Sequence, residues 1–112
     1  MRREVGQRGE LMAARYLKKM GYRVLQTNVR LAGCEIDIVA KQGKEIVFVE
    51  VKTRQSNVAG YPEDSVTPQK VHHIERAALA WLLENGEQPW RVDVIAVTMG
   101  GESEEIKHFV GI

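Results

Sequence analysis

Apolar side chains recur at helical spacing near the start of the chain, over residues 4–20. Leu11, Ala14 and Leu17 are three residues apart, so they share one face of an α-helix, and this pattern predicts a helix that packs on a core. Glu10 precedes Ala14 and Leu17 by four and seven residues, which places its carboxylate on the same apolar side. A carboxylate that points toward a core costs free energy unless another group uses it, so Glu10 is a candidate functional residue.

Shorter apolar runs follow, with the alternation that is typical of strands. A second helix is predicted to begin at Thr67 and Pro68, because threonine caps helices and proline suits their first turn, and to end near Gly86. A long irregular loop over 54–66 precedes this helix. The predicted strands cover residues 22–31, 34–40, 45–53, 90–98 and 105–110. This order of elements predicts an α/β domain whose mixed sheet of about five strands is flanked by helices.

Composition supports a single domain over residues 1–112. The hydrophobic fraction of 44% and the charged fraction of 28% are ordinary for a globular protein. Cys34 is the only cysteine, which excludes an intramolecular disulfide and a zinc site built from several cysteines. The sequence shows no secretory signal and no apolar run of membrane-spanning length, so we expect a cytoplasmic protein with no membrane partner.

The net charge of +1 is unevenly distributed. Residues 1–31 carry eight lysines and arginines against two glutamates, whereas residues 84–112 carry two basic residues against six acidic ones. The basic N-terminal third could bind phosphate groups, or it could be a solvated helix face. Charge alone favours the solvated face.

The stretch VFVEVKTR, residues 47–54, ends an apolar strand with charged side chains. Because successive side chains alternate across a strand, Glu50 and Lys52 share the face of Phe48, opposite the intervening valines. A carboxylate and an ammonium therefore follow each other along one otherwise apolar face.

The preceding strand, residues 34–40, offers a second carboxylate. Alternation puts Glu35 and Asp37 on one face and three apolar residues on the other: Ile36, Ile38 and Ala40. If the two strands pair as a hairpin, Asp37 lies on the same side as Glu50. Glu35 could support the groups around Asp37 or be a surface charge.

Two carboxylates beside an ammonium at one edge of a sheet suit a hard divalent cation. Mg²⁺ takes oxygen ligands and keeps several waters, so Asp37, Glu50 and a substrate phosphate would be enough to bind it. Lys52 could then position the attacking water and stabilise charge on the phosphate. The alternative is an ordinary ion pair between Glu50 and Lys52, with Asp37 as a third partner.

Asp93 lies within the strand predicted over 90–98 and is a further candidate. It could join the same acidic site, or it could pair with Arg91 or with a lysine of a neighbouring strand. We favour the pairing.

Together, EIDIVA at 35–40 and VFVEVKTR at 47–54 resemble the D…ExK core of the PD-(D/E)xK nuclease superfamily. More closely, the chain resembles the YraN-type family of small bacterial proteins, which is described as endonuclease-like and similar to archaeal Holliday junction resolvases. Two further stretches carry this resemblance, at 6–30 and 90–97. Ile36 stands where the superfamily name has proline, and Cys34 stands where many related sequences have glycine.

The resemblance implies a restriction-endonuclease-like fold and a role for each matching residue. Asp37, Glu50 and the backbone carbonyl of Val51 would bind the metal, and Lys52 would orient the attacking water. Glu10 would contact the metal site directly or through water. Weaker candidates for contact with DNA phosphates are Arg54, Gln69 and Lys70.

The expected function is therefore Mg²⁺- or Mn²⁺-dependent hydrolysis of DNA phosphodiester bonds. The resemblance to resolvases implies branched or junction DNA as substrate, and a homodimer would suit a two-fold symmetric junction. The alternative is a non-catalytic module that uses a nuclease fold to bind nucleic acid or a protein. RNA cleavage is a third interpretation that differs only in substrate.

Overall fold

A computed structural model describes residues 2–56, 67–101 and 104–112 of the chain. This part forms two helices and five strands, and every predicted element is present with bounds that agree within two residues. The elements are α1 (Arg2–Lys19), β1 (Arg23–Leu31), β2 (Cys34–Gln42), β3 (Glu45–Gln55), α2 (Pro68–Asn85), β4 (Trp90–Met99) and β5 (Glu105–Phe109). Arg54, predicted to begin a loop, belongs to β3, and residues 57–66 of that loop lie outside the described residues.

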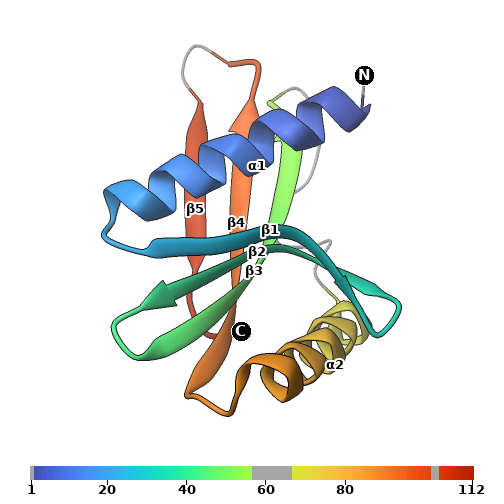
Figure 1. Ribbon diagram of the computed structural model, residues 1–112. Helices are drawn as coiled ribbons and strands as arrows, with labels where there is room; N and C mark the ends of the chain where they lie inside the picture. The colour runs from blue at the N-terminus through green and yellow to red at the C-terminus, as the bar shows by residue number, and fades with distance from the viewer. Residues whose placement is uncertain (1, 57–66, 102–103) are drawn as a thin grey trace.

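The strands form one mixed sheet in the order β1-β2-β3-β4-β5 (Figure 1). All neighbouring pairs are antiparallel except β3 and β4, which are parallel. Helix α2 makes the crossover connection between these two parallel strands, as such a pair requires. The Thr67 hydroxyl accepts a hydrogen bond from the Lys70 N–H over 3.2 Å, so the predicted N-cap is confirmed. The predicted α/β class with a five-stranded mixed sheet is also confirmed.

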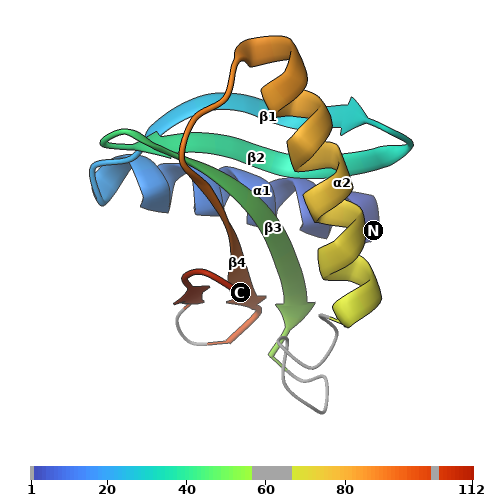
Figure 2. The ribbon, with the colours of Figure 1, turned by 90° about the horizontal axis from the view of Figure 1, so that it is seen from below.

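The two helices cover opposite faces of the sheet (Figures 1 and 2). Helix α1 buries Ala13 and Leu17 against one face, where Val47 and Val49 contribute to the same core. Helix α2 covers the other face, where the ring of Phe48 meets Trp81 edge to face at 5.6 Å between centroids. The alternation predicted for β3 is therefore confirmed. None of the described helices is long and apolar enough to cross a membrane.

The predicted core stripe of α1 is wrong at Leu11, which is 60% exposed. The residues that face the sheet are instead four apart: Gly9, Ala13 and Leu17, all of them buried. At Gly9 the helix lies so close to β3 that an added Cβ would overlap the Thr53 hydroxyl. Small side chains at this contact, rather than the largest apolar ones, set which face of α1 turns inward.

The alternation predicted for β2 is wrong at Ile36. Ile38 packs in the core beneath α1, as expected, but Ile36 packs in the core beneath α2. Between the pairs Thr27↔Ile38 and Val29↔Ile36, the residues opposite each other are Asn28 and Asp37. Asn28 has a φ of 53°, which is left-handed backbone in the middle of β1. The two strands bend together toward α2 (Figure 1), so a simple two-residue period fails there.

Asp93 is fully buried and belongs to a polar network of its own. Its carboxylate accepts a hydrogen bond from Arg91 Nε over 2.9 Å and one from the Gly111 N–H over 3.0 Å, and it lies 2.7 Å from His108 Nε2. Tyr16 reaches the other ring nitrogen of His108 over 3.0 Å and thereby ties α1 to β5. The predicted pairing of Asp93 with Arg91 is confirmed.

Candidate metal centre

The centre is built where β2 separates from β3. Pairing between these strands runs from Gln42↔Glu45 to Ile38↔Val49 and stops before Asp37 and Glu50, the next residues in register. The separation leaves the N–H of Val51 without a strand partner on that side, and it donates instead to Asp37 Oδ2 over 2.7 Å. The Asp37 carboxylate is thus fixed at the point where the sheet opens.

Glu50 and Lys52 lie on the α2 face of β3, as their alternation with Phe48 predicted. Lys52 Nζ is 3.3 Å from Glu50 Oε1, and the two side chains are only 19% and 15% exposed. Lys70, in the first turn of α2, adds a second ammonium beside that of Lys52. The neighbouring Lys52 and burial lower the pKa of Lys70 from its ordinary value, whereas the charge of Glu50 acts in the opposite direction.

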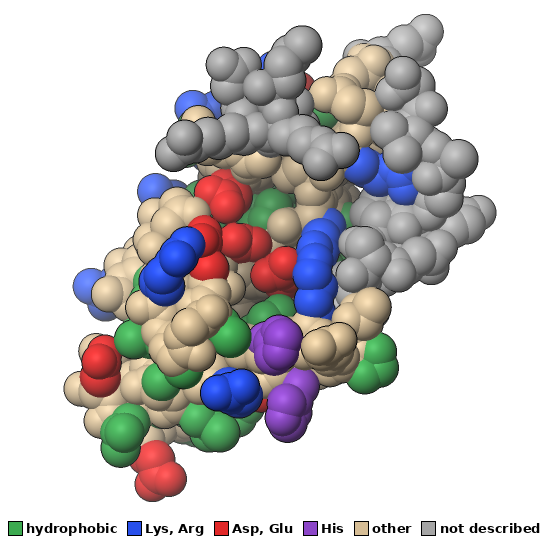
Figure 3. All heavy atoms as spheres, turned by 90° about the vertical axis from the view of Figure 1, so that its right-hand side faces the viewer, with side chains coloured by type: hydrophobic (Ala, Val, Ile, Leu, Met, Phe, Trp, Pro, Cys, Tyr) green, Lys and Arg blue, Asp and Glu red, His purple; other side chains and the backbone are tan. Residues whose placement is uncertain are grey.

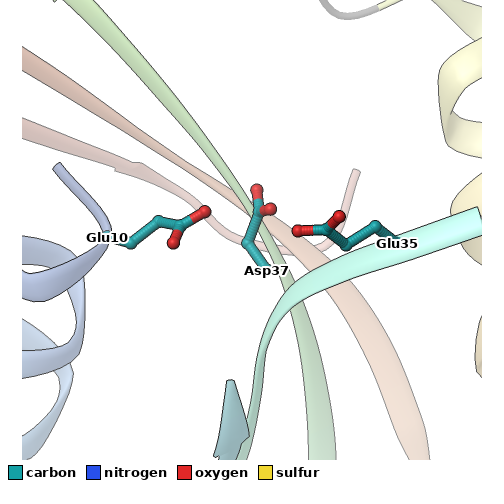
Figure 4. A group of neighbouring side chains, drawn as sticks. All are labelled: Glu10, Glu35 and Asp37. Atoms are coloured by element: carbon teal, nitrogen blue, oxygen red, sulfur yellow. The ribbon is translucent and has the colours of Figure 1, made fainter. Parts of the chain in front are cut away.

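Glu10 enters the centre from the other side of the sheet. The close contact between Gly9 and Thr53 holds this turn of α1 against β3, and Glu10 is the next residue along the helix. One carboxylate oxygen each of Glu10, Glu35 and Asp37 lies within 4.8 Å of the others. Figure 4 shows the three side chains pointing toward one another, one from α1 and two from β2.

Crowding of these carboxylates changes their acidity. Burial and the charge of Glu50 raise the pKa of Asp37 from 3.8 to about 7, although the hydrogen bond from Val51 opposes the shift. Burial also raises the pKa of Glu10, against the effect of a hydrogen bond from Asn28. The folded chain therefore holds carboxylates together at a free-energy cost that a cation among them would remove.

Glu35 and Asn28 are the parts of this centre that sequence reasoning left open or missed. Glu35 lies close to Asp37, and it is also exposed and pairs with Arg30 over 3.5 Å, so both of its proposed roles stay open. The side-chain amide of Asn28, oriented with its nitrogen toward the acids, lies 3.1 Å from Glu10 Oε2 and 3.1 Å from Glu35 Oε1. The one available signal was an asparagine inside a predicted strand, where this residue is uncommon.

On the surface, the acidic side chains gather in a recess with basic side chains on either side of it (Figure 3). A cavity of about 290 Å³ adjoins the centre between α1 and β1. Both Glu10 and Asn28 contribute to its lining. Solvent and small ions can therefore reach the acidic groups.

The structure brings together five of the residues predicted from sequence: Glu10, Asp37, Glu50, Lys52 and Lys70. Arg54 lies two residues beyond Lys52 on β3 and is half-exposed, and Gln69 is exposed beside Lys70. For these two residues, contact with phosphate stays a prediction. The Val51 carbonyl as a metal ligand also stays a prediction, although the N–H of the same residue is tied to Asp37.

The donor atoms of the centre fit a hard divalent cation. Four carboxylates, from Glu10, Glu35, Asp37 and Glu50, outnumber the two lysine ammonium groups and the Arg30 guanidinium beside them. Carboxylate oxygens suit Mg²⁺ and Mn²⁺, and the described centre contains neither cysteine nor histidine. The carboxylates of Glu10, Glu35 and Asp37 lie close enough together to share such an ion, and the charge of Glu50 acts on Asp37 beside them.

Comparison with known proteins places the chain in a family. The model of the family described as "Uncharacterised protein family UPF0102" matches residues 9–97. UPF0102 protein GSU0650 of Geobacter sulfurreducens is 47% identical over 107 residues, covering 93% of this chain and 84% of the relative. A UPF0102 protein of Trichlorobacter lovleyi is 50% identical over 103 residues, covering 89% of this chain and 81% of that protein.

A solved structure shares the fold. The crystal structure of AF1548, a protein of unknown function, matches with a TM-score of 0.53 and 26% sequence identity, over 86% of this chain and 48% of that one. The chain thus spans about half the length of AF1548. The mixed sheet of the present chain, flanked by one helix on each face, is consistent with the restriction-endonuclease-like fold that the sequence predicted. On the extent and identity of these matches, the chain belongs to the UPF0102 family.

Proposed function

We propose that this UPF0102 protein is a metal-dependent endonuclease that hydrolyses phosphodiester bonds of DNA. The observation that carries the proposal is the opening between β2 and β3, where the charge of Glu50 acts on the Asp37 carboxylate and Lys52 pairs with Glu50. The raised pKa of Asp37, about 7, marks a group whose charged form lacks a compensating cation. A purely structural ion pair needs no such excess of carboxylates.

Mg²⁺ or Mn²⁺ is the proposed cofactor. When bound, the ion would polarise the scissile phosphate and lower the pKa of a bound water. Asp37 and Glu50 would hold it, and the hydrogen bond from Val51 would keep the Asp37 carboxylate in one orientation. Glu10 would take part directly or through water.

The two lysines would act on the other reactants. Lys52, held within 3.3 Å of Glu50, would orient the water that attacks phosphorus. Lys70 lies beside it and would bind a non-bridging phosphate oxygen, where its positive charge opposes the charge that develops during attack. Arg54 and Gln69 are proposed as further phosphate contacts.

The outer face of α1 would steer DNA toward the centre. Arg8, Arg15, Lys18 and Lys19 are all exposed there. Binding through such groups weakens as salt rises, because it releases counterions from the DNA. Branched DNA is the proposed substrate class, and a homodimer would bring two centres to a symmetric junction.

The ion pair between Glu50 and Lys52 also supports a second candidate function. If both side chains serve only to neutralise each other, the protein would bind nucleic acid or a protein partner without cutting it. The two functions differ in what happens to substrate after binding.

A cleavage assay decides between them. Purified protein would be incubated with a labelled four-way junction and with a linear duplex of the same arm sequence, in Mg²⁺ and then in Mn²⁺. Cutting by wild type, and a loss of at least about a hundredfold in both Glu50→Gln and Lys52→Ala, is the expected result. Salt-sensitive binding without cutting in either metal would support the binding module instead. A matched RNA junction tests the alternative substrate.

A further inference from the structure

Asn28 stands out because its backbone and its side chain both depart from what a strand residue normally does. Its φ of 53° lies in the left-handed region, which non-glycine residues rarely adopt and which asparagine tolerates better than most. Strand β1 accepts this conformation in the middle of its pairing with β2. Such strain persists where surrounding structure or function requires it.

The strained backbone of Asn28 places its side chain beside the acidic residues of the centre. It lies opposite Asp37, and at this point β1 and β2 bend together. Its amide nitrogen, turned toward the acids, is 3.1 Å from Glu10 Oε2 and 3.1 Å from Glu35 Oε1. The amide has two hydrogens, so one side chain can donate to both carboxylates at once.

These two carboxylates belong to different elements, and no covalent or strand contact fixes their separation. Glu10 comes from α1, on one face of the sheet, and Glu35 comes from the first residues of β2, before the bend at Asp37 (Figure 4). A lysine or arginine in this place would neutralise the acids and displace a metal. An amide holds them by hydrogen bonds and adds no charge of its own, and Arg30 pairs with the other oxygen of Glu35 over 3.5 Å.

We propose that Asn28 is a positioning residue of the centre, which holds Glu10 and Glu35 on the two sides of Asp37 so that their charges act together on one bound cation. The proposal rests on the function proposed above. Asn28 need not touch the metal itself, and it acts through the two carboxylates. Groups that orient metal-binding side chains in this way typically change metal affinity about ten- to a hundredfold when removed.

The test is the affinity for Mn²⁺ alone, measured by titration calorimetry on the full chain. Asn28→Gly removes the amide while keeping a residue that adopts a φ of 53° without strain, so folding should persist, and thermal unfolding without metal verifies it. Ala32 has the same φ of 53° in the turn after β1 but no polar side chain, which makes Ala32→Gly the matched control. Wild type and Ala32→Gly should bind alike, and Asn28→Gly should bind about ten- to a hundredfold more weakly.

A double-variant comparison separates positioning from general structural damage. In a Glu10→Gln, Glu35→Gln background, Asn28→Gly should weaken Mn²⁺ binding less than about twofold further, because the groups it positions are already altered. Equal affinity of wild type and Asn28→Gly would overturn the inference while leaving the proposed function in place, and so would an equal loss in Ala32→Gly. Failure of wild type to bind Mn²⁺ would overturn both.

Discussion

The N–H of Val51 donates a hydrogen bond of 2.7 Å to Asp37 Oδ2, across the gap that opens where β2 leaves β3. A side chain thus replaces the backbone carbonyl that a continuing ladder would have supplied. The exchange satisfies the backbone of β3 and fixes a carboxylate beside Glu50. The opening in the sheet and the candidate metal centre therefore have the same structural cause.

Asp37 should make the metal-free protein less stable as pH rises. Its pKa is about 7 in the folded chain and near the ordinary value of 3.8 in the unfolded chain, so between these values the folded state holds a proton that the unfolded state has lost. The contribution of Asp37 to the free energy of unfolding is fully present below about pH 4 and is lost as pH rises through about 7. Asp37→Asn, which keeps an oxygen for the Val51 N–H, should be more stable than wild type at pH 8.

Urea unfolding without metal at pH 4 and pH 8 measures this difference. The gap between Asp37→Asn and wild type should be larger at pH 8 than at pH 4. Added Mg²⁺ should close the gap at pH 8 by stabilising wild type alone. If the stability difference between Asp37→Asn and wild type is the same at both pH values, the pKa of Asp37 is not raised by folding.

Gly9 should be essential for the placement of α1. An added Cβ would overlap Thr53 Oγ1 and lie 2.9 Å from Thr53 Cβ, so Gly9→Ala should lower the free energy of unfolding by about 1–3 kcal/mol. Gly6 is on the same helix with no atom within 4 Å of an added Cβ, and Gly6→Ala should raise stability by up to about 1 kcal/mol. Chemical denaturation of the two variants checks both signs, and a stable Gly9→Ala would show that the contact is not tight in solution.

Lys70 should contribute to DNA affinity through phosphate. Lys70→Ala should weaken binding to every DNA tested and reduce the slope of log affinity against log salt by about 1. Lys44 is an exposed lysine in the turn at the other end of the β2–β3 hairpin, and Lys44→Ala is the control for loss of charge alone. Fluorescence anisotropy at several salt concentrations measures the slopes. Identical slopes of log affinity against log salt for the two variants would show that Lys70 does not contact a DNA phosphate.

Asp93 should matter for stability. Asp93→Ala would leave Arg91 and the Gly111 N–H without their buried acceptor, so the free energy of unfolding should fall by about 3–5 kcal/mol. Asp93→Asn keeps an oxygen acceptor and should lose less. Urea denaturation compares the variants, and a loss below about 1 kcal/mol in Asp93→Ala would mean that solvent replaces the network easily.

Local patterns were enough to predict the side chains of β3. The two-residue period of a strand depends only on neighbouring residues, and it correctly placed Glu50 and Lys52 together on the face of Phe48. The hairpin with β2 brings Asp37 to the end of the sheet where Glu50 lies, although the alternation that was to place Asp37 on the face of Glu50 fails at Ile36. The placement of Glu50 and Lys52 follows from secondary structure alone.

The rest depends on tertiary structure that no local period describes. The left-handed backbone at Asn28 and the shared bend of β1 and β2 move Ile36 to the α2 side and turn Glu35 toward Asp37. The inward face of α1 is set by its close contact at Gly9, which is why Leu11 is exposed contrary to prediction. These features depend on how elements pack, and the hydrophobic pattern carries little information about that.

We propose that Asp37 and Glu50 hold a divalent cation. Crystals grown in Mn²⁺ test it most directly, because the anomalous scattering of manganese locates the ion without any assumption about activity. We expect an anomalous peak between the Asp37 and Glu50 carboxylates in wild type and its loss in Glu50→Gln. No peak at these residues at saturating Mn²⁺, with Lys52 still paired to Glu50, would contradict it.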